Sequence, residues 1–377
     1  MKLNFFRLPK ALLCFLMIIS PVLSATPTEQ IKEVLTNYIQ GTSYNDQGKI
    51  AQAFYPKTNL LLEKKDKAVW AVPIEEYISW FNSNKGKFNG RIGKILLIDI
   101  SGKIATAKVE IILPKKQLRY IDLFLLKQVE GRWQIISKTA SNEPSTQHGK
   151  RILFIVSNAH FHGDTQLPVG ASFSEIINAY VEFKKSGYTV DFMSPKGGSI
   201  SLSYIDTSNV LQKKHLYNAD FMYALANTKT PDEIQTSAYK AVHYIGGSSA
   251  MYGVAENIAI QQIVMDIYEN HKGIVSSVCH GTAGIAFLTL KNGEYLVSGK
   301  RISGYPDEYE NPNKAYFKQF PFKITETIEK HGGTFKYSER DMAHVEIDGR
   351  VITGQNYLSS ALVAQEIIKM IASESSE

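Results

Sequence analysis

Hydrophobic positions repeat in two different ways along the chain. In residues 26–142, apolar side chains first recur at helical spacing (Ile31, Leu35, Tyr38), with Thr28 as the expected N-cap. Further helices are expected at 50–56 and 74–81, and strands at 59–62, 68–72, 93–100, 104–112, 120–129 and 132–137. Helices followed by a meander of strands predict an α+β domain with a cone-like shape.

From residue 151 onward, strands and helices alternate. Strands are expected at 152–156, 188–192, 241–245 and 274–278, and helices at 171–185, 256–268 and 281–290. The strands are almost wholly apolar, as required when both faces of a sheet are covered. The pattern therefore predicts an α/β domain with a doubly wound, mostly parallel sheet.

The length of 377 residues suits two domains. The polar stretch 141–149 separates the two textures, so we expect domains at 26–142 and 151–377 joined by a linker at 143–150. The insertion 196–233 is longer than an ordinary connection and is expected to form a lid or cap near the site.

The first 25 residues have a secretory pattern. Lys2, Arg7 and Lys10 precede an apolar run from Ala11 to Leu23, which is too short to span a membrane and is followed by small residues. We expect a signal peptide at 1–25, export to the periplasm or the outside of a bacterial cell, and no stable membrane insertion after cleavage. An uncleaved membrane anchor is the alternative.

Removal of this leader changes the charge and the cysteine content. The formal net charge falls from +6 to +3 with the loss of three cations, and no Lys/Arg block remains, so nucleic acid is not an expected partner. Cys14 is lost as well, which leaves Cys279 as the only cysteine of the mature chain. Cys279 therefore cannot form an internal disulfide.

Cys279 stands where the apolar run Ile274–Val278 stops and a helical pattern begins at once. Strand, sharp turn, nucleophilic residue and helix are the parts of a nucleophile elbow, and the small residues Ser277 and Gly281 flank the turn. A thiol at a helix N-terminus lies at the positive end of the backbone dipoles, which favours the thiolate. The alternative is an inert buried cysteine, which the adjacent His280 disfavours.

Gly246 and Gly247 follow another expected strand, so they lie at the same carboxyl edge of the sheet as the elbow. Their backbone N–H groups, with Gly281, are candidates for oxyanion and substrate binding; an ordinary strand-end turn is the alternative. His160 and His162 have no carboxylate or cysteine at ligand spacing, so no metal is expected.

The opening helices of the first segment contain Tyr38, Gly41, Asp46, Phe54 and Pro56, and its last strand begins with Gly131-Arg132-Trp133. With these residues the segment resembles the SnoaL-like and nuclear-transport-factor-2-like families. Such a resemblance implies a fold that presents a pocket. The segment has no histidine, the commonest general base, so we expect a binding or dimerisation module, and a homodimer is compatible with it.

The second segment carries a set of characteristic stretches: Gly170–Glu175 with Phe183–Phe192, Gly246-Gly247, Cys279-His280-Gly281, Gly299–Tyr305 leading to Glu310, and Asp348–Asn356. With them, residues 150–372 resemble the ThiJ/PfpI superfamily, whose members share the glutamine-amidotransferase-like sheet. Within it the segment is most similar to the branch of heat-shock chaperones and glutathione-independent glyoxalases.

The resemblance implies roles for individual residues. Cys279 is implied as the nucleophile, Glu175 as a carboxyl that reaches the thiol, His280 as the acid/base partner and Glu310 as the group that orients His280. Burial and a thiolate charge would push Glu175 toward its protonated form. Adjacency on a helix does not aim His280 at Cys279, so an orienting group is needed, and the other carboxylates at 307 and 308 lie close in sequence.

One departure bears on the activity. The branch often continues the glycine pair with His-Gly, whereas this chain has Ser248-Ser249, so a substrate-contacting imidazole is missing or comes from His160 or His162. The expected function is an exported, cysteine-dependent enzyme that forms a hemithioacetal with a small reactive carbonyl such as methylglyoxal and yields a hydroxy acid without a cofactor. The alternatives are a peptidase- or amidase-type hydrolase using the same triad on an acyl substrate, and a non-catalytic redox- or stress-sensing binding protein.

Overall fold

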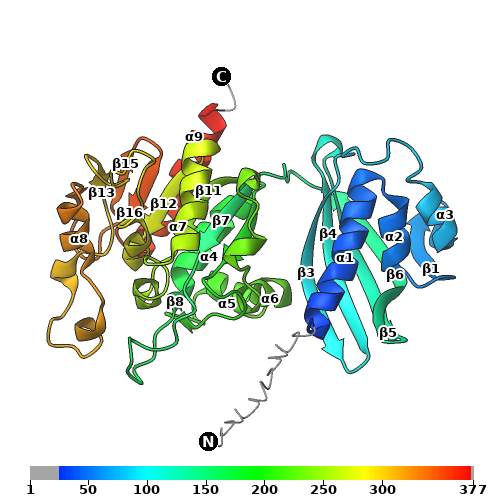
Figure 1. Cartoon of the computed structure of the whole chain (residues 1–377), viewed down its shortest axis with the longest axis horizontal. Coiled ribbons are helices and arrows are strands. Elements are labelled where there is room, and N and C mark those ends of the chain that lie inside the picture. Colours follow the sequence, from blue (N-terminus) through cyan, green and yellow to red (C-terminus); the bar gives the residue numbers. More distant parts are fainter. Residues whose placement is uncertain (1–24, 375–377) are drawn as a thin grey trace, which may run out of the picture.

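The computed structural model describes residues 25–374, so the expected signal peptide lies almost wholly outside it. The described chain has two parts, each built on its own six-stranded sheet (Figure 1). Among these residues, none of the helices has the length and apolar character needed to cross a membrane.

The N-terminal part packs three helices against a curved sheet. The helices are α1 (Pro27–Tyr44), α2 (Gln47–Ala53) and α3 (Ile74–Ser79), and the strands are β1 (Asn59–Lys64), β2 (Lys67–Pro73), β3 (Ile92–Ser101), β4 (Ile104–Leu113), β5 (Leu118–Val129) and β6 (Arg132–Pro144). The sheet order is β2-β1-β6-β5-β4-β3, and every pairing is antiparallel except β1 with β6. The predicted α+β class is confirmed.

Two boundaries of this part differ from the prediction. Thr26, and not Thr28, caps α1, because Pro27 suits the first helical position and the Thr26 hydroxyl and Glu29 form a capping box. Strand β6 extends through Pro144, so half of the expected polar boundary is paired with β5. The polar composition of residues 141–144 favoured a linker, but their backbone hydrogen bonds to β5 keep them in the sheet.

The C-terminal part contains the predicted doubly wound sheet. Its main elements are β7 (Arg151–Ile155), β8 (Ala171–Ser172), α4 (Phe173–Lys185), β9 (Thr189–Met193), β10 (Leu202–Ser203), α5 (Val210–Leu216), α6 (Ala219–Ala226), β11 (Tyr239–Tyr244), α7 (Ile258–Met265), β12 (Ile274–Val278), β13 (Arg301–Ile302), α8 (Ile324–Lys330), β14 (Thr334–Phe335), β15 (Val345–Asp348), β16 (Val351–Gly354) and α9 (Ser360–Glu374). The sheet order is β15-β16-β12-β11-β7-β9, and only β15 pairs antiparallel. The predicted fold class is confirmed.

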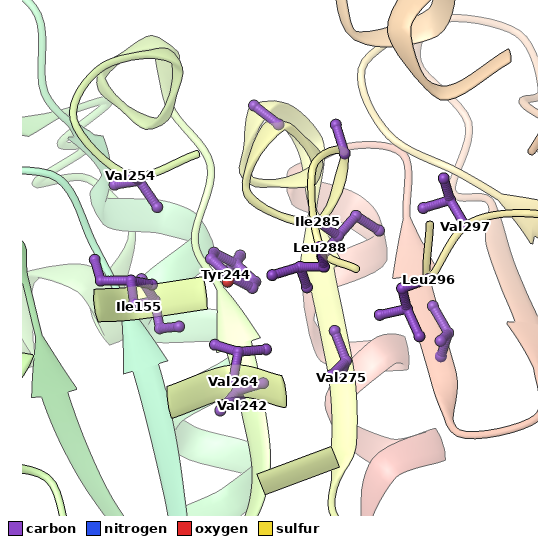
Figure 2. Close-up of a cluster of buried hydrophobic side chains, with 14 of the residues drawn as sticks. Ile155, Val242, Tyr244, Val254, Val264, Val275, Ile285, Leu288, Leu296 and Val297 are labelled. Carbon is purple, nitrogen blue, oxygen red and sulfur yellow. The ribbon is translucent and has the colours of Figure 1, made fainter. Parts of the chain in front are cut away.

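Alternate residues of the central strands enter two separate cores. Leu153 and Ile155 of β7 pack with α7 and the segment after the elbow, and Figure 2 shows part of this cluster around Tyr244. Ile152 and Phe154 pack on the other face with α4 and α9. Burial on both faces explains why these strands are continuous apolar runs.

The helix expected at 281–290 is shorter in the structure. A 3-10 helix runs from Cys279 to Ile285 and then ends. Gly281 and Gly284 lower helix propensity, and both pack too closely against Tyr244 to hold a side chain, with an added Cβ 2.4 Å and 2.3 Å from its atoms. Contact with the neighbouring strand therefore determines this segment more than its helical pattern does.

The insertion 196–233 is not a lid as a whole. Its strand β10 pairs with β8, beside the start of α4. Its helix α6 instead packs against β3 of the N-terminal part, and Asp220 of α6 forms an ion pair at 2.8 Å with Lys108 of the neighbouring strand β4. Figure 1 shows α6 facing the N-terminal sheet.

Candidate active site

Cys279 occupies a strained turn at the carboxyl end of β12. Its φ is +55°, a left-handed conformation that a non-glycine residue adopts at a cost, and its side chain is 8% exposed. Two hydrogen bonds stabilise the turn: the hydroxyls of Ser277 and Thr282 lie 2.8 Å apart, and the Thr282 hydroxyl donates to the Ser303 carbonyl. The predicted strand–turn–helix arrangement is therefore present, with a short 3-10 helix.

His280 connects Cys279 to Glu310. Its Nδ1 lies 3.4 Å from the Cys279 Sγ, and its Nε2 lies 2.7 Å from Glu310 Oε1. The imidazole also stacks on Tyr305, with ring centroids 4.9 Å apart. Neighbouring residues meet here because the left-handed backbone of Cys279 lies before the regular helical turns, so the helix rule that separates adjacent side chains does not apply.

Glu310 is held on its far side by Tyr316, whose hydroxyl donates to Oε2 at 2.7 Å. Burial alone would raise the pKa of Glu310, but the hydrogen bond and charge of His280, together with Tyr316, outweigh burial and lower it. Glu310 therefore stays ionised and can fix the imidazole. Sequence reasoning did not identify Tyr316, because nothing in its local pattern marks a tyrosine that folds back onto a carboxylate.

Glu175 approaches the thiol from α4. Ser172 caps this helix, and Glu175 stands in its first turn with 3% exposure. The Gly246 N–H donates to its Oε2 at 3.0 Å. Burial raises the pKa of Glu175 to about 8, so the acid carries its proton at neutral pH. The resemblance implied this protonated state, and the structure gives burial as its main cause.

Burial, and next the carboxylate charge of Glu175, raise the pKa of the Cys279 thiol. This direction is opposite to the expectation of a dipole-stabilised thiolate, because the 3-10 helix is short and the thiol is removed from water. Hydrogen bonds from the backbone N–H groups of His280 and Gly247 stabilise the thiolate and so lower the pKa of Cys279, by less than the other two contributions raise it. A proton on Glu175 removes the second unfavourable contribution, so thiol and acid titrate as a coupled pair.

The three glycines of the predicted oxyanion region have different surroundings. The Gly246 N–H already donates to Glu175, and an added Cβ would lie 2.4 Å from the Oε2 of that acid. Gly247 has φ +86°, and its N–H is directed at the thiol. Gly281 packs against the Tyr244 carbonyl, which accounts for a glycine there without any ligand. Among the three, Gly247 is best placed to meet a bound oxygen.

Two further side chains surround the site. His162 is buried behind His280: its ring packs on Phe320, which also contacts His280, and its Nδ1 lies 3.2 Å from the Tyr252 hydroxyl. Tyr204, just after β10, has φ +55° and is 66% exposed, and partial burial followed by the charges of the catalytic groups raises the pKa of its phenol. Strained left-handed backbone at a bulky residue such as Tyr204 is typical of functional sites. No pattern in the sequence predicted it.

His160 and His162 have separate partners in the structure. The His160 ring bonds to the Ser201 hydroxyl, and His162 faces aromatic rings. Within residues 25–374, no group of three His, Cys, Asp or Glu side chains is arranged to hold a metal ion.

Family models match both parts of the chain. Residues 167–370 match the model of the DJ-1/PfpI family. Residues 26–141 match a model described as “Putative lumazine-binding”. The resemblance of the second segment to the ThiJ/PfpI group and that of the first to the SnoaL-like, nuclear-transport-factor-2-like group are both confirmed by these matches.

Similar proteins include two curated yeast proteins. Glyoxalase 3 of Candida albicans is 27% identical over 224 residues, which cover 56% of this chain and 93% of that protein. The glutathione-independent glyoxalase HSP31 of Saccharomyces cerevisiae is 28% identical over 229 residues, with the same coverage of 56% and 93%.

Solved structures share the fold of the C-terminal part. The crystal structure of glyoxalase III from Candida albicans aligns with a TM-score of 0.54 and 24% identity, covering 59% of this chain and 98% of that one. The Rapid Encystment Protein of 24 kDa from Francisella tularensis aligns with a TM-score of 0.55 and 22% identity, covering 58% and 98%.

Proposed function

The chain belongs to the DJ-1/PfpI family, and we propose that its C-terminal domain is a cysteine-dependent, glutathione-independent glyoxalase acting on small reactive carbonyls such as methylglyoxal. One observation carries the proposal. The Cys279 thiol lies between His280, which Glu310 orients, and Glu175, which is protonated at neutral pH. The names of the similar yeast proteins support the same reaction class.

The first step is addition of sulfur to the aldehyde carbon. His280 takes the thiol proton as the carbon–sulfur bond forms, and Glu310 stabilises the resulting imidazolium. The aldehyde oxygen gains negative charge and receives the proton of Glu175, which gives the hemithioacetal and leaves Glu175 as a carboxylate. The Gly247 N–H, directed at the thiol, stabilises charge in the same region.

The second step moves hydrogen between two carbons of the substrate. The Glu175 carboxylate removes the proton from the carbon bonded to sulfur while the His280 imidazolium gives its proton to the ketone oxygen, which forms an enediol. Glu175 then returns its proton to the neighbouring carbon, and the hydroxyl on the sulfur-bonded carbon gives its proton back to His280, so the former ketone becomes an alcohol. The aldehyde carbon is thereby oxidised to a thioester while the ketone carbon is reduced. Water then hydrolyses the thioester to a 2-hydroxy acid and restores the thiol, so the sum is methylglyoxal plus water giving lactate. The step needs no external oxidant or reductant.

The environment of Cys279 disfavours the redox-sensor alternative. Oxidation requires an accessible thiolate, whereas this thiol is 8% exposed and burial raises its pKa. A hydrolase would use the same three side chains, with an acyl group in place of the aldehyde.

The test is lactate formation from methylglyoxal by residues 26–377, beside the variants Cys279→Ala and Glu175→Gln. We expect turnover by the wild type, none above background for Cys279→Ala, and a loss of about 10²- to 10⁴-fold for Glu175→Gln. Wild-type protein that cleaves ester or amide substrates but makes no lactate would refute the glyoxalase assignment in favour of the hydrolase.

We also propose that the enzyme acts outside the cytoplasm after removal of residues 1–25. The basic start and the short apolar run that follows support this location. Cell fractionation and N-terminal sequencing of the purified protein test it, and a cytoplasmic protein that retains Met1 would contradict it. A homodimer through the N-terminal domain stays a prediction, which light scattering of the purified protein decides.

A further inference from the structure

A cavity of about 780 Å³ lies between the two domains. Its walls come from α1 and β3 of the N-terminal domain and from α4, β9 and α6 of the C-terminal domain. None of Cys279, His280, Glu175 and Glu310 lines it, so it is separate from the candidate active site. Its volume is within the range of sites for small organic ligands.

Cations outnumber carboxylates in the lining. Among the described residues, the positive side chains are Lys32, Arg91, Lys94, Arg119, Arg151, Lys184 and Lys229, and the negative ones are Glu110, Asp191, Asp220 and Glu233. This leaves an excess of three positive charges. Walls of low dielectric strengthen the attraction that such a cavity exerts on an anion.

The carboxylates that face the cavity already have partners. Asp191 is 3% exposed, forms ion pairs with Lys94 at 3.0 Å and Arg151 at 2.9 Å, and accepts a hydrogen bond from Tyr239. Glu110 accepts from Arg119 at 2.6 Å. Asp191 and Glu110 are thus occupied by cations that lie nearer to them than Lys184 and Lys229 do, and Asp220 is paired with Lys108 at 2.8 Å.

Four cations of the lining, Lys32, Arg91, Lys184 and Lys229, have no carboxylate closer than 3.8 Å among the described residues. Lys184 and Lys229 lie on the C-terminal domain's side, where Lys184 is attracted by Glu110 only at longer range. Lys184 has no carboxylate within 4 Å among residues 25–374, and Lys229 has only Asp191 at 3.8 Å. Burial lowers the pKa of both ammonium groups, which shows that water does not fully compensate them. A half-buried cation without a close partner is stabilised by any anion that reaches it.

Two polar atoms of the lining also lack partners. The hydroxyl of Tyr223 and the Nε of Arg91 are buried without a hydrogen bond. Buried polar groups are nearly always bonded in native proteins, so two orphans on one cavity indicate a ligand or water that completes them. Both are donors, which matches an acceptor-rich ligand.

We propose that this interdomain cavity binds a small organic anion, a carboxylate or a phosphate ester, whose charged group is held by Lys184 and Lys229. Because the cavity is walled by both domains, a bound anion neutralises repulsion between cations contributed from the two sides. The ligand therefore stabilises the contact between the domains and gives the N-terminal domain a binding role.

The test is calorimetric titration of the purified protein with three probes: inorganic phosphate, D-lactate and adenosine monophosphate. We expect saturable binding of at least one, and the probe that binds distinguishes a phosphate from a carboxylate ligand. The Lys184→Met variant should bind it about 10- to 100-fold more weakly, as loss of a charge-assisted bond requires. The Lys229→Met variant should also bind the probe more weakly than the wild type.

Lys185→Met is the matched control, because its side chain is 68% exposed and pairs with Glu182 on the outer side of the same helix. It should bind the probe as the wild type does, and so should Cys279→Ala. Equal affinities for Lys184→Met and Lys185→Met, with both variants folded by circular dichroism, would overturn the proposal. Absence of saturable binding for all three probes would overturn it as well.

Discussion

Replacement of Glu175 by Gln should remove a specific pH dependence of stability. In the folded protein the pKa of Glu175 is raised from 4.5 to about 8, mainly by burial. Between these values the folded chain keeps a proton that the unfolded chain has released, so the stability contributed by this group is complete below pH 4.5 and is lost as pH rises toward 8. The slope is about 1.4 kcal/mol for each pH unit, which sums to roughly 4–5 kcal/mol.

The amide of Glu175→Gln has nearly the same shape, keeps an acceptor for the Gly246 N–H and does not titrate. The variant should therefore gain stability over the wild type as pH rises, although it loses activity. Cys279 keeps its proton through this range, since its pKa is raised, so the difference reports on Glu175.

The assay is denaturant unfolding of both proteins at several pH values across the window. Glu182→Gln on the same helix is the control, because the pKa of Glu182 is lowered and its replacement should leave the wild-type slope in place. If wild type and Glu175→Gln lose stability in parallel with pH, Glu175 is already ionised in the folded protein, and its assignment as the proton donor is refuted.

Three further substitutions test other parts of the structure. Tyr316→Phe removes the hydrogen bond to Glu310 and should lower kcat/KM about tenfold or more, with the acid limb of the pH profile moved upward. Gly246→Ala places a Cβ 2.4 Å from the carboxyl oxygen of the catalytic acid and should abolish turnover and lower the melting temperature. Lys138→Met leaves the buried carboxylate of Asp122, now paired at 2.8 Å, without its cation, and should destabilise the N-terminal domain by about 3–5 kcal/mol in thermal unfolding.

Each of these has an outcome that contradicts it. An unchanged pH profile for Tyr316→Phe would show that the tyrosine does not position the triad. Full activity of Gly246→Ala would mean that the acid need not contact this backbone. A Lys138→Met variant as stable as the wild type would show that the Asp122 charge is compensated by Arg91 or by water.

The strands and the elbow could be predicted because their signals are local. Apolar runs such as Ile274–Val278 leave few alternatives to a strand buried on both faces, and small residues around Cys279 indicate a tight turn. The end of the following helix could not be predicted, because contact with Tyr244, distant in sequence, limits its length. The N-cap of α1 was missed by two residues, since two threonines compete and the proline between them decides.

By itself, the pattern of the sequence determined the two domains, the parallel sheet and the place of Cys279 and the glycine pair at its carboxyl edge. Periodicity and residue type suffice for these, because they follow from which faces of each element must leave water. The roles of Glu175, His280 and Glu310 were implied by the resemblance to the family. Only the tertiary structure decided the raised pKa of the Cys279 thiol, the hydrogen bond from Tyr316 to Glu310 and the cationic cavity between the domains. These depend on burial and on distances between residues far apart in the chain, and electrostatic free energies change steeply with both.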